Sequence, residues 1–267
     1  MVKSNSENVL EVFELNTWYG NRKILSDINL NVSRNEIMVI MGHSGSGKST
    51  LLRYILGLEK IKKGVIKLLD KEISKLNKSE LYKLRKRIGV AFQSGALFSS
   101  MTVGENIELP LYENTDLDKA TIQIMSRIKL ELMQLSGTES LMPSELSGGM
   151  LKRAGLARAV IMDPELLFFD EPSAGLDPIT SAHLDDLILQ LRDALNMSII
   201  VVTHDLESAF KIADKITVLD KGKIILTGNK EKIKKSNDPR IINMLARRAI
   251  TDPLDTEDYL NRLTKKL

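Results

Sequence analysis

The chain has 267 residues, and its 38 Lys and Arg nearly balance its 35 Asp and Glu, so the formal net charge of +3 says little about partners. Hydrophobic residues make up 43% of the chain, which excludes disorder as its main state and predicts one large α/β domain or two small lobes. The absence of cysteine excludes disulfides, cysteine-ligated zinc, iron–sulfur clusters and a thiolate nucleophile.

Short, continuously apolar runs separated by helical patterns predict the strands of a largely parallel, doubly wound sheet that is buried on both faces. None of these runs approaches the roughly 18 residues of a membrane span, and the first residues lack the apolar core of a signal peptide. We therefore expect a soluble, cytoplasmic chain that meets a membrane only through a partner. The expected strands are 37–41, 88–92, 166–170, 198–202, 216–220 and 223–228.

The first motif with chemical meaning is GHSGSGKST, which fits G-x-x-x-x-G-K-[ST] and lies between an apolar strand and a helix-like segment. Small residues let successive N–H groups turn toward phosphates, and the helix adds its positive amino end. An ordinary Gly/Ser loop is the alternative, which the complete spacing disfavours. We expect Lys48 to reach the β- and γ-phosphate oxygens, Ser49 to ligate Mg²⁺ and Thr50 to lie on the α-phosphate side. The loop residues expected to bind nucleotide are Gly42, His43, Ser44, Gly45, Ser46, Gly47, Lys48, Ser49 and Thr50. Among them, His43 fills an unspecified position and has no role of its own.

Two segments are locally basic. Residues 60–87 carry eleven Lys and Arg, and residues 221–235 carry six Lys. A solvated surface is the simpler interpretation, and attraction to anionic headgroups or nucleic acid is the alternative.

Residues 94–162 contain no comparable buried-strand run and are rich in helix formers, which predicts a helical lobe inserted into the α/β core. Near its end, LSGGM opens a helix-like segment, where Ser147 and the N–H groups of Gly148 and Gly149 can receive a phosphate. The motif is weak alone, since such turns are common. A second anion site in a chain with one nucleotide loop nevertheless suggests that two chains share two nucleotides.

The run LLFFDE places Asp170 and Glu171 at the carboxyl end of a buried strand, where α/β proteins bind ligands. We expect Asp170 to hold Mg²⁺ and Glu171 to orient and deprotonate the attacking water. Unrelated loop acids beside a strand are the alternative.

Asp177 and Pro178 then predict the start of a helix with one apolar face.

Taken in this order, the motifs resemble the ATP-binding cassette (ABC) ATPases over about residues 8–235. The resemblance implies a P-loop NTPase core of the α/β class, with an N-terminal antiparallel β subdomain and an inserted α-helical subdomain. It also implies an enzyme that hydrolyses ATP with Mg²⁺ and works as a homodimer. We assign residues 1–235 to this ATP-binding domain and residues 236–267 to a C-terminal extension.

The same resemblance implies roles for further residues. Tyr19 matches the aromatic that stacks on adenine, and Gln93 matches the glutamine that senses Mg²⁺ and the attacking water and links to the transport partner. LSGGM matches the loop that reaches the γ-phosphate across the dimer. Asp177 matches the loop where the two ATPases communicate, and His204, in VVTHD, matches the histidine that contacts the γ-phosphate.

Simpler alternatives remain for four of these positions. Tyr19 can be a half-buried aromatic, Gln93 a polar strand end, Asp177 a helix cap and His204 a core histidine. Met150 departs from the glutamine that is common at the end of this loop, which removes an amide that can contact the ribose.

Three segments, FQSGALFSSMTVGENIELPL, LMPSELSGGM and FDEPSAGLDPITS, resemble the ATPases of the Mla/Mce lipid transporters. That resemblance implies two ATPases on the cytoplasmic side of the inner membrane, which power an MlaE-like permease pair joined to an MCE-domain protein. A small STAS-domain subunit often accompanies them, and the cargo is phospholipid. Residues 94–111 are expected to receive the permease because they follow Gln93 and carry the apolar residues Leu97, Phe98 and Met101.

Other classes fit less well. An ABC importer or exporter of another cargo remains the main alternative. A soluble ABC protein acting on ribosomes or DNA usually carries two cassettes or a long coiled coil, so no nucleic-acid partner is expected. A P-loop kinase would need neither LSGGM, SAGLD nor VVTHD.

The final segment continues beyond the minimal cassette from about Asp238. A mobile tail is one interpretation. Our hypothesis is that Ile241, Ile242, Met244 and Leu245 form an apolar helix face that docks on the neighbouring ATPase or an accessory subunit.

Overall fold

The computed structural model describes residues 7–247. Its larger sheet has the strand order β10-β9-β3-β8-β7-β6, in which β9, β3, β8, β7 and β6 are parallel and β10 is antiparallel to β9. The strands are β3 (Ile37–Met41), β6 (Ile88–Ala91), β7 (Leu166–Asp170), β8 (Ser198–Thr203), β9 (Lys215–Asp220) and β10 (Lys223–Gly228). The predicted strands agree within one residue at each end. One correction is that β6 ends at Ala91, so Phe92 lies outside the strand and is 46% exposed.

Alternate residues of β3 face two different cores, which explains its continuous apolar run. Ile37, Val39 and Met41 join the core beneath the helices on one face. Met38 and Ile40 join the core on the opposite face. A central parallel strand covered on both sides has no solvent-facing positions to fill with polar residues.

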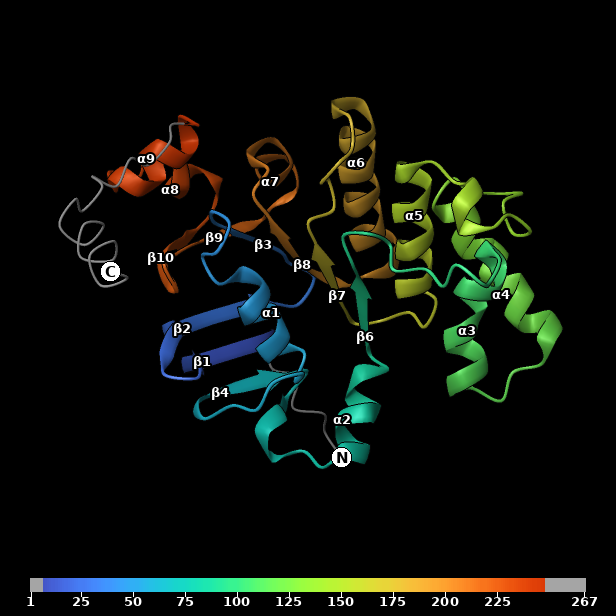
Figure 1. Cartoon of the computed structure of the whole chain (residues 1–267), viewed down its shortest axis with the longest axis horizontal. Coiled ribbons are helices and arrows are strands. Elements are labelled where there is room, and N and C mark those ends of the chain that lie inside the picture. The colour runs from blue at the N-terminus through green and yellow to red at the C-terminus, as the bar shows by residue number, and fades with distance from the viewer. Residues whose placement is uncertain (1–6, 248–267) are drawn as a thin grey trace, which may run out of the picture.

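A second, antiparallel sheet has the strand order β2-β1-β4-β5 and packs on α1 (Lys48–Ile55). Figure 1 shows β1, β2 and β4 grouped beside α1. Leu51 and Ile55 of α1 are fully buried in the core that this sheet shares with β3. Its strands are β1 (Asn8–Tyr19), β2 (Arg22–Ser33), β4 (Lys63–Leu68) and β5 (Lys71–Glu72). The predicted fold class, with its N-terminal antiparallel subdomain, is confirmed.

Residues 94–162 hold α3, α4 and α5 and no strand, and these helices gather at the end of the molecule away from β10 (Figure 1). Reciprocal hydrogen bonds start α3, because Thr102 Oγ1 accepts from Glu105 N and the Glu105 carboxylate accepts from Thr102 N. The α-helices besides α1 are α2 (Lys78–Arg85), α3 (Val103–Asn114), α4 (Lys119–Leu132), α5 (Gly148–Ala159), α6 (Pro178–Leu195), α7 (Leu206–Ile212), α8 (Lys230–Lys234) and α9 (Pro239–Leu245), and 3₁₀ turns span Ile73–Lys75 and Pro143–Glu145. Within residues 7–247, no helix is long and apolar enough to span a bilayer.

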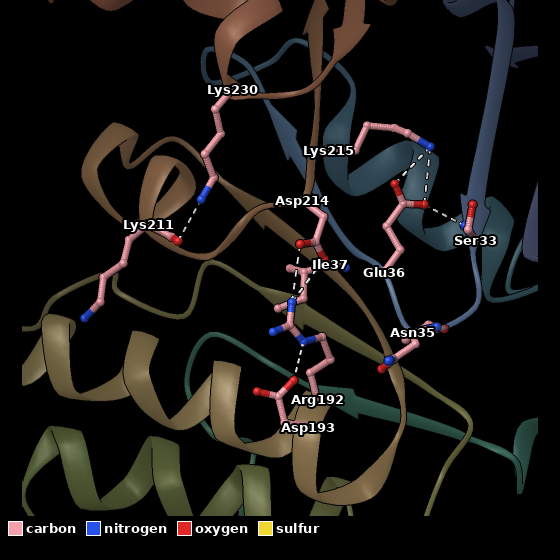
Figure 2. Close-up of polar contacts among 11 residues, drawn as sticks. Ser33, Asn35, Glu36, Ile37, Arg192, Asp193, Lys211, Asp214, Lys215 and Lys230 are labelled. Carbon is pink, nitrogen blue, oxygen red and sulfur yellow. Dashed lines mark hydrogen bonds and ion pairs between the residues drawn. The ribbon is translucent and has the colours of Figure 1, made fainter.

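A polar network holds the amino end of β3 in place (Figure 2). The Asp214 carboxylate accepts from Ile37 N at 2.8 Å and pairs with the Arg192 guanidinium at 3.2 Å. Beside it, Glu36 pairs with Lys215 at 2.9 Å. The network joins the start of β3 to the start of β9 and to the last turns of α6. It therefore fixes the strand whose other end carries the phosphate loop.

The structure corrects the hypothesis for the final segment. Ile241 is fully buried in the chain's own core, and Met244 and Leu245 pack against that core. Of the four apolar residues, Ile242 alone is largely exposed, at 45%. The helix face predicted for another chain is therefore covered mostly by this chain itself, because α9 packs against the chain's own core. The remainder of the expected extension lies outside the described residues.

Candidate functional site

Parallel pairing brings three strand ends to one edge of the larger sheet. Met41 lies opposite Thr203, and Asp170 lies opposite Val202. The residues that follow these strands therefore meet at the same edge, which is where open α/β sheets bind ligands. These residues are the phosphate loop, Glu171 and His204.

The phosphate loop is compact and contains a buried cation. Lys48 is 8% exposed, and its Nζ donates to Gly42 O at 2.7 Å and to His43 O at 3.1 Å. Burial lowers the pKa of Lys48, while the negative charges of Glu171 and Asp170 act in the opposite direction. The ammonium thus lies across the loop and faces two carboxylates.

One buried polar atom of the loop has no partner in the described chain. Ser46 Oγ is buried and makes no hydrogen bond. Such an atom is costly unless a ligand or water supplies a partner. A bound phosphate oxygen is a suitable acceptor, so the loop fits an anionic ligand. Glycine is required at Gly42, because a Cβ atom there would lie 2.1 Å from Leu219 O.

Two acidic residues follow one another at the end of β7. Burial raises the pKa of Asp170, the charge of Glu171 raises it further, and Lys48 lowers it. Glu171 has a positive φ of 49° and its N–H donates to Val202 O at 2.8 Å. Its Oε2 lies 2.8 Å from His204 Nδ1 and accepts from His204 N at 3.3 Å. The carboxylate is thus fixed between β7 and β8, with a mostly exposed imidazole beside it.

A cavity of about 940 Å³ opens over this edge. Of the predicted residues, Gly42, His43, Ser44, Gln93, Glu171 and His204 line it. Its volume lies within the range of ligand sites, about 300–1,000 Å³. The chemistry gathered around it comprises N–H groups for anions, a carboxylate, an imidazole and an amide.

Three residues that the sequence did not predict for this site also line the cavity, from α9 and the residues after it: Asn243, Met244 and Arg247. Arg247 also pairs with Glu207 at 2.6 Å. No motif marks these positions, because they reach the cavity from a separate helix, and even Arg247 and Glu207 are forty residues apart in the chain.

Several predicted residues do not line this cavity, among them the LSGGM residues and Tyr19. Ser147, Gly148 and Gly149 lie at the amino end of α5, where Ser147 Oγ accepts from Met150 N at 3.3 Å. Tyr19 ends β1 and is 53% exposed. None of the four lines the cavity of their own chain.

Asp177 caps α6. Its carboxylate accepts from Ile179 N and Thr180 N, both at 3.0 Å, and from Thr180 Oγ1. The hydrogen bonds from Thr180 lower the pKa of Asp177. The helix-cap interpretation therefore holds.

Comparisons with known proteins point to one family. The family model described as "ABC transporter" matches residues 25–174. The "Intermembrane phospholipid transport system ATP-binding protein MlaF" of Haemophilus influenzae is 42% identical over 240 residues, which cover 90% of this chain and 91% of the relative. The "Probable ribonucleotide transport ATP-binding protein mkl" of Mycobacterium leprae is 36% identical and covers 90% of this chain and 70% of the relative.

Solved structures give the same result. The structure of cbiO1 from Clostridium perfringens, part of the ABC transporter complex cbiONQ, matches with a TM-score of 0.80 at 32% identity and covers 91% of this chain and 97% of that one. A dimeric, post-hydrolysis structure of the ATP-binding cassette MJ0796, bound to ADP and Pi, matches with a TM-score of 0.75 at 29% identity and covers 82% and 98%.

Proposed function

Because this chain belongs to the ABC transporter family as an ATP-binding, ATP-hydrolysing cassette, we propose that it powers the movement of phospholipids between membranes. The observation that carries the proposal is the 42% identity to MlaF over about nine tenths of both chains. Transport of another cargo, such as ribonucleotides, is the second candidate. This candidate is favoured only by the 36% identity to mkl, and that match covers 70% of the relative's length.

We assign the hydrolytic step to the residues at the sheet edge. Glu171 takes the proton of the attacking water, and His204, 2.8 Å away, contacts the γ-phosphate and keeps the carboxylate in place. Lys48 leaves the loop carbonyls and binds the β- and γ-phosphate oxygens. Gln93 lines the same cavity and reports its occupancy to the permease.

The donor set fits Mg²⁺ bound together with nucleotide. Magnesium prefers oxygen ligands, keeps several waters and binds through one or two carboxylates plus substrate phosphates. Asp170 supplies the carboxylate, Ser49 a hydroxyl and Gln93 an amide oxygen. Asp170 lies within electrostatic range of Lys48, the neighbour of Ser49 in the chain. When bound, the ion neutralises charge that develops on the phosphates.

The cassette acts as a pair of copies. Ser147, Gly148 and Gly149 expose a helix amino end that does not line their own chain's cavity, so they are available to close the partner's nucleotide. Gly149 lies against Thr180, whose hydroxyl donates to Asp177, so Asp177 is close to this helix end. Closure depends on the γ-phosphate, because this group binds the closed state better than the open one, and hydrolysis resets it.

We place the permease on residues 94–111. Phe98 is 52% exposed, while its own N–H and C=O are both bonded by the buried Asn106 side chain. An exposed aromatic on a fixed backbone suits a protein partner. Leu97 is half-buried against the chain's own core, so Phe98 is the main apolar contact. On this proposal the chain sits at the cytoplasmic side of the inner membrane, with an MCE-domain protein and a small STAS-domain subunit in the same complex.

Co-purification tests the assignment. The chain is tagged, native membranes are solubilised gently, and the proteins that accompany it are identified by mass spectrometry. We expect an MlaE-like permease and an MCE-domain protein. A permease of another class, or ribosomal proteins, would leave the ATPase chemistry intact and overturn the proposed cargo.

A further inference from the structure

A buried lysine joins the helix of the LSGGM motif to the segment that follows Glu171. Lys152, in the second turn of α5, is only 8% exposed. Its Nζ donates to Pro172 O at 2.6 Å and to Ala174 O at 2.5 Å. These carbonyls belong to the residues one and three positions after Glu171. Among residues 7–247, the ammonium is therefore bonded only to the backbone just after Glu171.

The electrostatics place the same ammonium near the carboxylate itself. Burial lowers the pKa of Lys152, and the charge of Glu171 opposes that change. A buried ammonium is retained only where hydrogen bonds and a nearby opposite charge compensate its lost hydration. Here the two carbonyls and the Glu171 charge supply both forms of compensation.

The residue just before the backbone that Lys152 bonds is strained. Glu171 has a φ of 49°, in the left-handed region that residues other than glycine rarely adopt. Such conformations persist only when surrounding contacts fix them. Within the main chain, Glu171 N donates to Val202 O at 2.8 Å and Ala174 N donates to Glu171 O at 3.3 Å. Lys152 adds two side-chain bonds from α5, to Pro172 O and Ala174 O of this turn.

We propose that Lys152 is a positioning residue that fixes the Glu171 carboxylate to α5. The same helix begins with Ser147, Gly148 and Gly149. When this helix end docks on the nucleotide of a second copy, Lys152 transmits the contact to Glu171, the catalytic base of its own chain. Each copy thereby senses closure at one nucleotide and aligns hydrolysis at the other. The inference rests on the proposed role of Glu171 and on the pairing of two cassettes.

A double-mutant cycle in the complex purified through the tagged chain tests this role. Lys152→Met should lower kcat for ATP hydrolysis about 100-fold, the cost typical of a misplaced catalytic group, with KM changed less than about twofold. Lys152→Arg should restore much of the loss, because a guanidinium can donate to both carbonyls. Added to Glu171→Gln, Lys152→Met should change the residual rate by less than about twofold, since no base remains to be positioned.

The matched control is Lys129→Met. Lys129 is about as buried, at 7% exposed. Its ammonium instead pairs at 2.5 Å with Asp163, the residue just after the helical lobe. We expect this change to lower the melting temperature and leave kcat within about twofold. If Lys152→Met does not assemble, Lys152→Gln, which keeps a donor amide, goes through the same cycle.

Three results would overturn the inference. They are an unchanged kcat in Lys152→Met or Lys152→Gln, an equal loss in Lys129→Met, and an undiminished effect of the Lys152 change in the Glu171→Gln background. Wild-type turnover in Glu171→Gln alone would instead overturn the assigned base, whatever the Lys152 variants do.

Discussion

A single methyl group at Gly222 should disturb both stability and nucleotide binding. Gly222 lies in the turn between β9 and β10 with a φ of +75°, and a Cβ atom there would lie 1.9 Å from Ile24 O. Its N–H donates to Ser46 O in the phosphate loop at 2.9 Å, and its carbonyl accepts from Ser26 N at 2.8 Å. The turn therefore supports the loop directly, and Gly222→Ala forces it away from β2.

The expected cost follows from these contacts. An alanine in the left-handed region costs about 1–2 kcal/mol. Moving the turn breaks or weakens two backbone hydrogen bonds, at about 1 kcal/mol each. We therefore expect Gly222→Ala to lose about 3–4 kcal/mol of unfolding free energy. Gly137→Ala is the matched control, because Gly137 has a φ of +82° with no atom within 4 Å of its Cβ position, so only the first cost, about 1–2 kcal/mol, applies.

Urea unfolding of the full chain and titration with a fluorescent ATP analogue measure the two effects. Gly222→Ala should unfold at lower urea than Gly137→Ala and bind the nucleotide more weakly, while Gly137→Ala should bind it as the wild type does. Equal unfolding free energies in the two variants would refute the reasoning from the contact with β2. An unchanged nucleotide affinity in Gly222→Ala would refute the proposed support of the loop.

Three further predictions concern charged groups. Glu171→Gln should bind ATP but hydrolyse it about 10²–10⁴-fold more slowly and accumulate as a closed dimer, which single-turnover kinetics and light scattering detect; wild-type turnover contradicts it. Lys48→Ala should weaken ATP binding about 10- to 100-fold, and an unchanged dissociation constant in calorimetry argues against its phosphate contact. Burial raises the pKa of Asp185 from its ordinary value of 3.8, with the Ser208 hydrogen bond acting in the opposite direction. The folded carboxyl therefore keeps its proton at pH values where the unfolded one has lost it. The free energy of unfolding is highest below the unfolded pKa and falls as pH rises through the raised, folded pKa. Asp185→Asn should remove this fall of the unfolding free energy with pH, which urea unfolding at several pH values measures. Identical curves of stability against pH for the wild type and Asp185→Asn would refute the expectation.

The parts of the structure that could be predicted are those with a local signal. The strands on both sides of the site are continuous apolar runs, because each is covered on both faces. A motif directly follows three of them, so the sequence alone places Gly42, Glu171 and His204 at one sheet edge. The helix cap at Asp177 was equally local, since Pro178 follows it.

The contacts that could not be predicted join distant parts of the chain. Nothing near Lys152 in the sequence shows that its ammonium reaches Pro172 O, twenty residues away. The apolar pattern around Ile241 indicates a buried face, yet it does not show whether the covering surface belongs to this chain or another. Side-chain exposure could not be predicted either. Leu97 and Phe98 are adjacent apolar residues, and only the fold makes the first half-buried and the second exposed.

The most direct test of the account is ATP-dependent phospholipid transfer by the purified complex that contains this chain. Labelled phospholipid is followed between donor and acceptor membranes with wild-type chain and with Glu171→Gln, at saturating ATP and without it. The account predicts transfer only with the wild-type chain and ATP, although Glu171→Gln still binds the nucleotide. Transfer that continues in Glu171→Gln, or ATP hydrolysis by the wild type that moves no phospholipid, would contradict it.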